Sequence, residues 1–400
     1  MKKVYLVNPK RTAIGAFLGS LSTVSATEMA AAVIKEILAQ TNLQADVIDE
    51  VIAGHVLTAG GRLGPARHAS LKAGVPEGVP ANSVNMACGS GMKAVMNAFT
   101  SIQAGLGNVY VAGGMESMSQ APYIMPGARQ GLRMGDKQIH DHMIHDGLID
   151  PLLNYHMGVT AENVADKYGI TREKQDEFAI RSQQKAIQAI DSGAFKDEII
   201  PITVKSRREE IIFDTDEYPN RSTNLEKLAA LKPAFRDGGT VTAGNASGIN
   251  DGACFMLVVS EEALKKHNLE PIAELIAIGQ GGVDPSIMGM GPVPAVANSL
   301  KMANLSLKDI NLIEMTEAFA AQSLGVVAEL ASGHKESEEA ILARLNLNGG
   351  AIALGHPVGA SAARIITSLS YLMKKQKAAY GLATCCIGGG MGTAVVLKGI

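Results

Sequence analysis

"GHPVGASAARIITSLSYLMKKQKAAYGLATCCIGGGMG" spans residues 355–392 and repeats the plan of an earlier stretch, "CGSGMKAVMNAFTSIQAGLGNVYVAGGM", at residues 88–115. Each stretch starts with a turn of small residues, runs through a helix into a strand of high β propensity, and closes on consecutive glycines. A repeated plan of this kind indicates a diverged internal duplication. The pair of stretches therefore predicts a chain built from two related halves.

Strands and helices alternate on both sides of these stretches. Short strands are predicted at 3–8, within 47–54, at 83–87 and at 108–112, and helices are predicted at 27–40, 64–73 and 89–104. The alternation resumes with strands at 254–260, 272–279 and 312–315 and a helix at 292–303. Alternation of this kind predicts a layered α/β fold around a largely buried sheet.

The segment between the two halves has a different character. Residues 121–150 are rich in Gly, Met and His and show no clean period, residues 159–192 read as one long helical region, and residues 209–233 are polar and loop-like. We therefore expect an insertion at 119–250. It would separate an N-terminal half at 1–118, completed by about 251–270, from a C-terminal half at 271–400.

Composition excludes several classes of protein. The 400 residues are 46% hydrophobic and 19% charged, with a net charge of −3 and no basic block. That balance argues against a general nucleic-acid binder, which needs a basic face. No run approaches 18 apolar residues, so no membrane span is expected. The N-terminus is too short in apolar length for a signal peptide and the C-terminus carries no peroxisomal address, which favours the cytoplasm.

Four cysteines supply the first candidate chemistry. The spacing of Cys88, Cys254, Cys385 and Cys386 fits neither a zinc site nor a disulfide framework, so reduced thiols are expected. Cys88 stands at the predicted start of a helix, where unpaired N–H groups and the helix dipole favour the thiolate. This position indicates a nucleophile, although a small buried packing residue is the alternative.

His356 and Cys386 are the other candidates. His356 lies in a tight loop of glycine and proline ahead of a helix, where it could act as a base or simply bond to the backbone. Cys386 ends a strand before a glycine run that offers free N–H groups to an oxyanion. Packing is the alternative for Cys386, and it is the interpretation preferred for Cys385.

Two other patterns are set aside. "GGGMG" and "GGM" lack the spacing of a dinucleotide fingerprint. His140, His142 and His145 have a possible metal-ligand spacing, but only Asp141 and Asp146 lie nearby, and a solvated loop is the favoured interpretation. No metal and no redox cofactor is expected.

The chain resembles the thiolase family, in particular its acetyl-CoA acetyltransferase type. The resemblance extends over essentially all 400 residues. It rests on these motifs in this order: "VNMACGSGMKAV", "AGGMESMSQAPY", "YHMGVTAENVADKYGITREKQDEFAIRSQQKA", "GTVTAGNASGINDGA", "MGMGPVPA", "TEAFAAQ", "NGGAIALGHPVGAS" and "GLATCCIGGGMG".

The resemblance implies a five-layered αβαβα duplication with an inserted loop domain, and it implies roles for the candidate residues. Cys88 would carry the acyl group, His356 would activate it, and Cys386 would move the α-proton of the second substrate. The N–H groups of Cys88 and Gly388 would form one oxyanion hole. His356 and a water held by Thr316 would form the other, although the family usually has Asn at that position.

Contacts to coenzyme A carry over with the motifs. They fall on Leu148, His156, Met157, Phe235, Ala243, Ser247, Met288, Ala318 and Phe319. Two further positions depart from the family. Lys227 stands where a serine often touches coenzyme A, and Arg221 is expected to meet the nucleotide in a shifted register. Ala362 replaces a family glycine, and about eight extra residues around 331–345 are expected to form a surface helix.

The implied activity is the reversible Claisen condensation of two acetyl-CoA to acetoacetyl-CoA and coenzyme A. The alternatives are a 3-ketoacyl-CoA thiolase of broader chain length and a non-catalytic scaffold that binds coenzyme A. Residues 121–150 resemble a tetramerisation loop, so a homotetramer, a dimer of dimers, is expected. The expected small-molecule partners are acetyl-CoA, acetoacetyl-CoA and coenzyme A.

Overall fold

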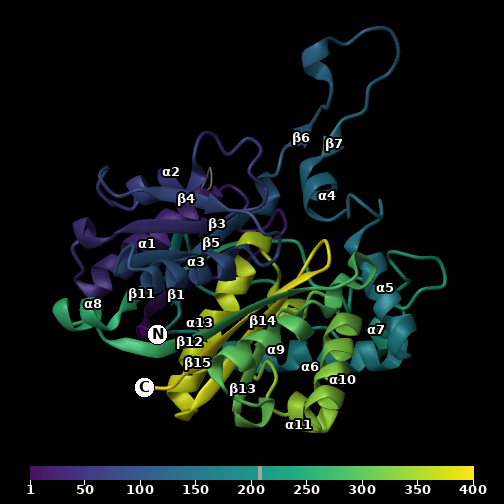
Figure 1. Cartoon of the computed structure of the whole chain (residues 1–400). Coiled ribbons are helices and arrows are strands. Elements are labelled where there is room, and N and C mark those ends of the chain that lie inside the picture. The colour runs from purple at the N-terminus through teal and green to yellow at the C-terminus, as the bar shows by residue number, and fades with distance from the viewer. Residues whose placement is uncertain (206–209) are drawn as a thin grey trace.

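The computed structural model describes residues 1–205 and 210–400. Its main feature is a mixed sheet in which the strands follow the spatial order β13-β14-β15-β12-β1-β11-β5-β3-β4 (Figure 1). The bounds of these strands, in chain order, are β1 Val4–Thr12, β3 Glu50–Gly54, β4 Ala81–Val84, β5 Val109–Ser117, β11 Asn250–Ser260, β12 Pro271–Gly282, β13 Leu312–Met315, β14 Tyr380–Ile387 and β15 Met391–Lys398. Two short strands join at the side: β2 (Gly15–Ala16) pairs with β11, and β8 (Ile199–Ile200) pairs with β1.

The sheet has matching arms on either side of the β1–β12 pair. From β1 outward, β11 and β5 follow antiparallel, and β3 is parallel to β5. From β12 outward, β15 and β14 follow antiparallel, and β13 is parallel to β14. The helix before β5 is α3 (Ser90–Ala104), and the helix before β14 is α13 (Val358–Gln376). The predicted duplication is confirmed, because α3–β5 and α13–β14 occupy equivalent places.

Three hydrophobic clusters separate the layers. One lies between the N-terminal strands and α1 (Ala26–Thr41), α2 (Pro65–Lys72) and α8 (Glu261–Lys266). A second surrounds α3 and α13, which pack between the two halves of the sheet. A third lies between the C-terminal strands and α9 (Pro292–Ala303) and α10 (Ala320–His334). Side chains alternate between clusters along each strand, as the pleat requires: Leu6 enters the central cluster, and Tyr5 and Val7 enter the first. The αβαβα layering is therefore confirmed.

The two central helices approach each other closely at their N-terminal ends. A Cβ on Gly91 of α3 would come within 2.9 Å of the Gly359 carbonyl oxygen and 3.0 Å of the Ala363 Cβ, both on α13. A Cβ on Gly114 of β5 would collide with the same carbonyl. Contacts this tight are open only to glycine at these positions. They bring the segment before α3 next to the segment before α13.

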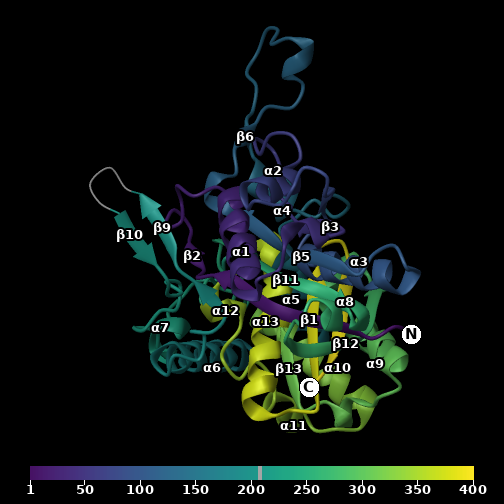
Figure 2. The ribbon, with the colours of Figure 1, turned by 90° about the vertical axis from the view of Figure 1, so that its left-hand side faces the viewer.

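The insertion carries a short antiparallel pair, β6 (Tyr123–Ile124) with β7 (His140–Asp141), at the base of an arm, defined here as residues 123–141. Figures 1 and 2 show the arm extending away from the body in both views. A second antiparallel pair consists of β9 (Ile202–Lys205) and β10 (Glu210–Phe213). The helices of the insertion are α4 His142–Gly147, α5 Met157–Tyr168, α6 Arg172–Asp191 and α7 Leu225–Ala229. The remaining short helices are α11 Glu338–Leu342, α12 Ala351–Leu354, η1 Ala45–Val47, η2 Met118–Gln120, η3 Ala128–Gln130, η4 Pro285–Met290 and η5 Leu307–Asp309.

Some local expectations were wrong. The single helical region at 159–192 is two helices, because Gly169 takes a left-handed φ of 60° and caps α5 before Thr171 caps α6. The strand expected at 83–87 is β4, which ends at Val84. The polar segment expected at 209–233 contains β10 and α7, and Glu209 itself lies outside the described residues. The surface helix expected at 331–345 is the end of α10 followed by α11.

No helix in the described ranges is both long and apolar enough to cross a membrane.

Candidate active site

Cys88 lies in the turn that joins β4 to α3. Ala87 before it has a left-handed φ of 41°, and the Ser90 hydroxyl ties the turn by donating to the Ala87 carbonyl at 2.7 Å and accepting from the Met86 N–H at 2.9 Å. Gly89 has no room for a side chain, because a Cβ there would collide with Ile387 at the end of β14. The turn therefore holds the half-buried Cys88 against the loop that follows β14.

The Cys88 thiol is protonated at rest. Burial raises its pKa to about 11, although the N–H groups of Gly388 and of Cys88 itself face the sulfur and act to lower it. The expectation that the helix start would give a resting thiolate is therefore corrected, because desolvation outweighs the N–H groups. Those two N–H groups nevertheless converge on the sulfur from two different loops. A pair of donors aimed at one point can stabilise an oxyanion that forms beside Cys88.

His356 is held by its backbone and its ring. Its N–H donates to the Asn250 side-chain oxygen at 2.9 Å, and its Nδ1 lies 2.6 Å from the Ser361 Oγ. The Ser361 hydroxyl donates its only proton to the Pro357 carbonyl at 2.9 Å, so it must accept the proton of Nδ1. Nε2 is then the unprotonated nitrogen. It is buried and has no hydrogen-bond partner among the described residues.

The same surroundings keep His356 neutral. Burial, followed by the positive charge of Arg364, lowers the pKa of His356 to about 4. A neutral imidazole with a free Nε2 lone pair is the form that takes a proton from a neighbouring thiol. His356 is thus prepared as a base at neutral pH.

Cys385 and Cys386 are adjacent in β14 and point to opposite faces of the sheet. Cys385 enters the central cluster, where its thiol donates to the Cys88 carbonyl at 3.4 Å, and Cys386 enters the third cluster. Both are buried and both are free thiols. Burial raises the pKa of Cys386 well above its ordinary value, and the neighbouring Cys385 and Cys88 raise it further.

Thr316 follows β13 and is fully buried. Its N–H donates to the Thr384 carbonyl at 3.1 Å, which fixes the backbone beside the end of β14. Within the described ranges its hydroxyl makes no hydrogen bond of good geometry, although it lies near the Cys385 thiol and acts to lower the pKa of that thiol, against the larger effect of burial. A buried hydroxyl of this kind can hold a water molecule, which is the use that the sequence suggests for it.

Most of the residues expected to contact coenzyme A come together. The third cluster contains Cys386 and five of them: Met157, Phe235, Met288, Ala318 and Phe319. The His156 ring stacks on Phe235 with centroids 4.8 Å apart, and Phe235 meets Phe319 edge-on at 6.0 Å.

The neighbouring backbone connects this group to Cys88. Ser247 donates its N–H to the Ala318 carbonyl at 2.8 Å, and Met157 donates its N–H to the Leu148 carbonyl at 2.9 Å. Leu148 in turn packs in the small cluster that includes Cys88. These residues therefore form an apolar wall that leads from the insertion to the two cysteines.

Comparison with known protein families agrees with this geometry. The model described as "Thiolase, N-terminal domain" matches residues 4–262, and the model described as "Thiolase, C-terminal domain" matches residues 269–399. The chain belongs to the thiolase family.

Similar proteins cover the whole chain. An acetyl-CoA acetyltransferase of Pseudomonas aeruginosa is 53% identical over 398 residues, covering 99% of each chain, and one of Escherichia coli is 50% identical, covering 100% of this chain and 99% of its own. Among solved structures, the acetyl-CoA acetyltransferase of Bacillus anthracis superposes with a TM-score of 0.95 at 42% identity. Human mitochondrial 3-ketoacyl-CoA thiolase superposes with a TM-score of 0.93 at 40% identity. Both cover 100% of this chain and 99% of their own.

Three of the residues expected to contact coenzyme A are not gathered at the apolar wall. Arg221 is exposed and paired with Asp191, its Nη2 lying 2.5 Å from the carboxylate. Lys227 donates from Nζ to the Ser222 carbonyl at 2.7 Å. Ala243 is exposed. Arg221 and Lys227 are therefore bonded to neighbouring residues of the chain in this structure.

The histidines of the insertion are also accounted for. His142 is buried rather than solvated: its Nδ1 lies 2.6 Å from Asp146, and its Nε2 accepts the Ala59 N–H at 3.3 Å. His145 shares the Asp146 carboxylate. In the described part of the chain, no group of three or more His, Cys, Asp or Glu side chains is placed to hold a metal ion.

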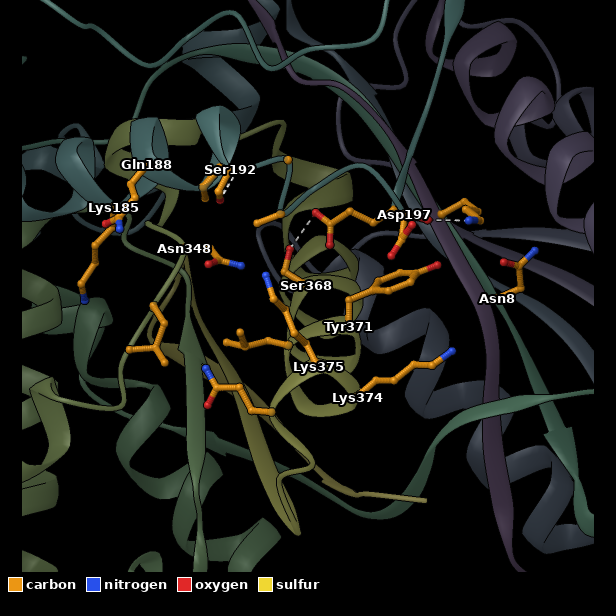
Figure 3. A pocket seen from close by; sticks show the side chains of 18 residues that line it. Asn8, Lys185, Gln188, Ser192, Asp197, Asn348, Ser368, Tyr371, Lys374 and Lys375 are labelled. Carbon is orange, nitrogen blue, oxygen red and sulfur yellow. Dashed lines mark hydrogen bonds between the residues drawn. The ribbon is translucent and has the colours of Figure 1, made fainter.

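A cavity of about 900 Å³ lies at the opposite end of α13 from His356 (Figure 3). Ser368, Tyr371 and Lys375 of α13 face Lys185 and Gln188 of α6 across it. No cysteine or histidine lines this cavity.

Three buried polar residues near the site were not singled out from the sequence. Ser361 fixes the His356 tautomer, Arg364 lowers the His356 pKa, and Glu116 bonds to the first turn of α13. Ser361 lies in the "GHPVGAS" motif and Glu116 in "AGGMES", so both were quoted without a role. An acidic residue at the end of an apolar strand was the available signal for Glu116.

Substituting Ser361 with alanine is predicted to slow acyl transfer about three- to tenfold, the effect of losing one ordinary hydrogen bond. Without the acceptor at Nδ1, the His356 ring can place its proton on Nε2, where it blocks the base. Steady-state rates with acetoacetyl-CoA and coenzyme A measure this. Ser370→Ala is the matched control, since Ser370 also donates to the carbonyl four residues earlier on α13. Equal rates for both variants would contradict the assigned tautomer.

Proposed function

We propose that the protein is an acetyl-CoA acetyltransferase that condenses two acetyl-CoA into acetoacetyl-CoA and coenzyme A and also runs the reverse thiolysis. The supporting observation is the convergence at one point of the Cys88 thiol and the N–H groups of Cys88 and Gly388. The buried thiol of Cys386 lies within electrostatic reach of that point. The names of the similar acetyltransferases support the same activity.

In the first half-reaction, His356 Nε2 takes the Cys88 proton as the sulfur attacks the thioester carbonyl. The N–H groups of Cys88 and Gly388 hold the oxyanion. When the carbon–sulfur bond of the substrate breaks, His356 returns the proton to the departing sulfur of coenzyme A. The products are acetyl-Cys88 and neutral coenzyme A thiol. A thiol is suited to this exchange because attacking and leaving sulfurs are nearly equivalent.

In the second half-reaction, a further acetyl-CoA binds, and Cys386 gives its thiol proton to His356 Nε2. The resulting Cys386 thiolate removes the α-proton of the substrate. The enolate oxygen is held by the Nε2 proton of the protonated His356 and by a water on Thr316. The enolate carbon attacks acetyl-Cys88, forming the new carbon–carbon bond and releasing the Cys88 thiolate. His356 then gives its Nε2 proton to the Cys88 thiolate, and Cys386 keeps the α-proton, so all three groups return to their resting neutral forms. Reversal of these steps gives thiolysis.

Thr316 would do the job of the family asparagine less completely, by holding a water. A threonine hydroxyl can donate one proton to a water, but it is shorter than an amide and has no NH₂ group. The water would therefore be held by fewer bonds. The buried hydroxyl of Thr316 supports this use.

The insertion at 119–250 would act as the loop domain that binds coenzyme A. Leu148, His156, Met157, Phe235 and Ser247 come from this segment. They meet Met288, Ala318 and Phe319 of the C-terminal half at the apolar wall. Ala243, Arg221 and Lys227 lie further out on the insertion, where the charged nucleotide end would meet solvent. Arg221 and Lys227 would exchange their local partners for phosphate oxygens on binding.

The acyl group is proposed to be short. Met157 and Met288 are buried in the same apolar cluster as Cys386, where they would limit the room for a long chain. The rival is a thiolase of broader chain length, since the fold is shared with a 3-ketoacyl-CoA thiolase. Turnover of acetoacetyl-CoA against longer 3-ketoacyl-CoA esters separates the two.

The working form is proposed to be a cytoplasmic homotetramer, a dimer of dimers. The arm exposes large apolar side chains, including Leu132, Ile139 and the fully exposed Met134. Exposed apolar groups on a projecting segment are typical of a surface that pairs with another copy. The cytoplasm suits the mechanism because its reducing environment keeps Cys88 and Cys386 as thiols.

Cys88→Ala is predicted to abolish acyl-enzyme formation. Intact-mass measurement after incubation with acetyl-CoA should show one added acetyl group on the wild type and none on the variant. Cys254→Ala is the control, because Cys254 is a buried thiol of the central cluster. Acetyl retained on the Cys88 variant would rule out this residue as the nucleophile.

Cys386→Ser is predicted to separate the two half-reactions. Exchange of acetyl groups with labelled coenzyme A should continue, because Cys88 and His356 remain. Condensation should fall by about 10²–10⁴, the usual contribution of a general base, since a hydroxyl is a far poorer base than a thiolate. Cys385→Ser, on the opposite face of β14, should keep the wild-type ratio of the two rates. Parallel losses of exchange and condensation in Cys386→Ser would contradict this division.

Charges on the arm are predicted to break the tetramer. Leu132→Glu combined with Met134→Glu should shift the mass measured by light scattering from four chains to two, because burying a carboxylate in an apolar interface is costly. Leu106→Glu changes an equally exposed residue on the body and should leave the mass unchanged. A tetramer that survives the double substitution would place the contact elsewhere.

A further inference from the structure

Glu116 is a fully buried acid at the end of β5 that no step of the proposed mechanism uses. Its Oε2 accepts the N–H of Val56 at 3.1 Å and the N–H of Gly359 at 3.0 Å. Its Oε1 accepts the N–H of Leu57 at 3.2 Å and lies 3.4 Å from the His55 Nε2. A single carboxylate thus collects three backbone N–H groups from two segments that are 300 residues apart in the chain.

Both segments belong to the surroundings of the active site. Gly359 is in the first turn of α13, three residues after His356. Val56 and Leu57 follow β3, and they pack in the same small cluster as Cys88 and Val358. The carboxylate therefore joins a segment from the N-terminal half to the start of the helix that carries the histidine of the C-terminal half.

The space around Gly359 admits no side chain. A Cβ there would come within 2.6 Å of the Met115 carbonyl oxygen and 2.9 Å of the Glu116 Oε2. The backbone of α13 is thus pressed against β5 at the point where the carboxylate holds it. A shift of either segment would change the distance between His356 and Cys88.

Burial of the Glu116 side chain disfavours its ionised form. Burial raises its pKa to about 7, although the three N–H groups act to lower it. The titratable groups that face it are His55, Cys88 and Asp251. Burial lowers the His55 pKa to about 4, with a further contribution from His142, so His55 is neutral, and Asp251 raises the Glu116 pKa further. Because the folded pKa lies above the ordinary value of 4.5, protonated Glu116 favours folding, and this contribution is lost as the pH rises through about 7.

We propose that Glu116 is a positioning residue: its carboxylate fastens the first turn of α13 to the segment after β3 and so holds His356 in register with Cys88. The expected effect on turnover rests on the proposed function, whereas the placement itself does not. An ionised carboxylate this close also acts on the Cys88 thiol, whose pKa it raises. The effect of Glu116 on the pKa of Cys88 can therefore be measured without any substrate.

Two substitutions separate the clamp from the charge. Glu116→Gln keeps one oxygen for Val56 and Gly359, so it keeps the bonds that join the two segments. It removes the charge and the acceptor of the Leu57 N–H. Glu116→Ala removes the charge and the clamp together. Glu198→Gln is the matched control. It is another buried carboxylate, bonded to Arg11 at 2.6 Å and to Ser368 at 3.1 Å, and it lies away from Cys88.

The experiment measures three quantities on each full-length variant: the Tm at pH 8, kcat and KM for thiolysis, and the pH midpoint of Cys88 alkylation by iodoacetamide. Glu116→Gln should lower the alkylation midpoint without lowering the Tm. Glu116→Ala should lower kcat about 100-fold, the effect of a misplacement of about 1 Å, with KM nearly unchanged. Glu198→Gln should lower the Tm and leave kcat and the midpoint at wild-type values.

Two results would contradict the positioning role of Glu116. An unchanged midpoint in Glu116→Gln together with wild-type kcat in Glu116→Ala would overturn the proposal. A loss of Tm in Glu116→Gln with an unchanged midpoint would also overturn it, since the residue would then be purely structural. If Glu116→Ala does not fold, the midpoint of Glu116→Gln decides. If the wild type lacks thiolase activity, the proposed function fails, while the midpoint and the Tm still test Glu116.

Discussion

The whole arrangement depends on one steric constraint: the N-terminal ends of α3 and α13 must approach until their backbones touch. Gly91, Gly114 and Gly359 permit this, because a methyl group at any of them would press on a backbone atom of the opposite element. Each helix starts just after a reactive residue, Cys88 in one case and His356 in the other. The contact of the two helix ends is therefore also the meeting of the two halves of the reaction centre. The three glycines, because they lack side chains, thus set how closely the segments that carry Cys88 and His356 approach.

Around that contact, the layers of the fold differ in how tightly they pack and in the side chains that they contribute. The central layer is dry and tightly packed, and it keeps the thiols and the imidazole neutral until substrate arrives. The insertion supplies an apolar wall from aromatic and methionine side chains, which can adapt to a flexible ligand arm. The central layer thus contains Cys385 with Cys88 packed against it, and residues 119–250 contribute to the apolar wall. This division agrees with the rule that binding groups lie on loops held by a stable scaffold.

The sequence predicted the duplication and the layers, and its motifs supplied Cys88, His356 and Cys386 as candidates, because each of these depends on local patterns. The helix at 292–303 and the strand at 312–315 were placed with their observed bounds for the same reason. The pKa of Cys88 was predicted with the wrong sign, since the helix start is visible in the sequence and the depth of burial is not. Glu116 and Ser361 were missed as functional residues. Glu116 acts on backbone N–H groups up to 243 residues away, which no residue pattern reveals.

The pairing of β1 with both β11 and β12 also bears on how the chain is made. The central strand of the sheet is β1, and its neighbours are residues 254–260 on one side and 271–274 on the other. One edge of β1 therefore lacks its main partner until residue 260 has been synthesised, and the other until residue 274. Contacts so distant in sequence close slowly, and open strand edges invite pairing with other chains in the meantime. The late closure of the centre of the sheet therefore leaves strand edges of the nascent chain open to pairing with other chains, which is the kind of exposure that chaperones counter.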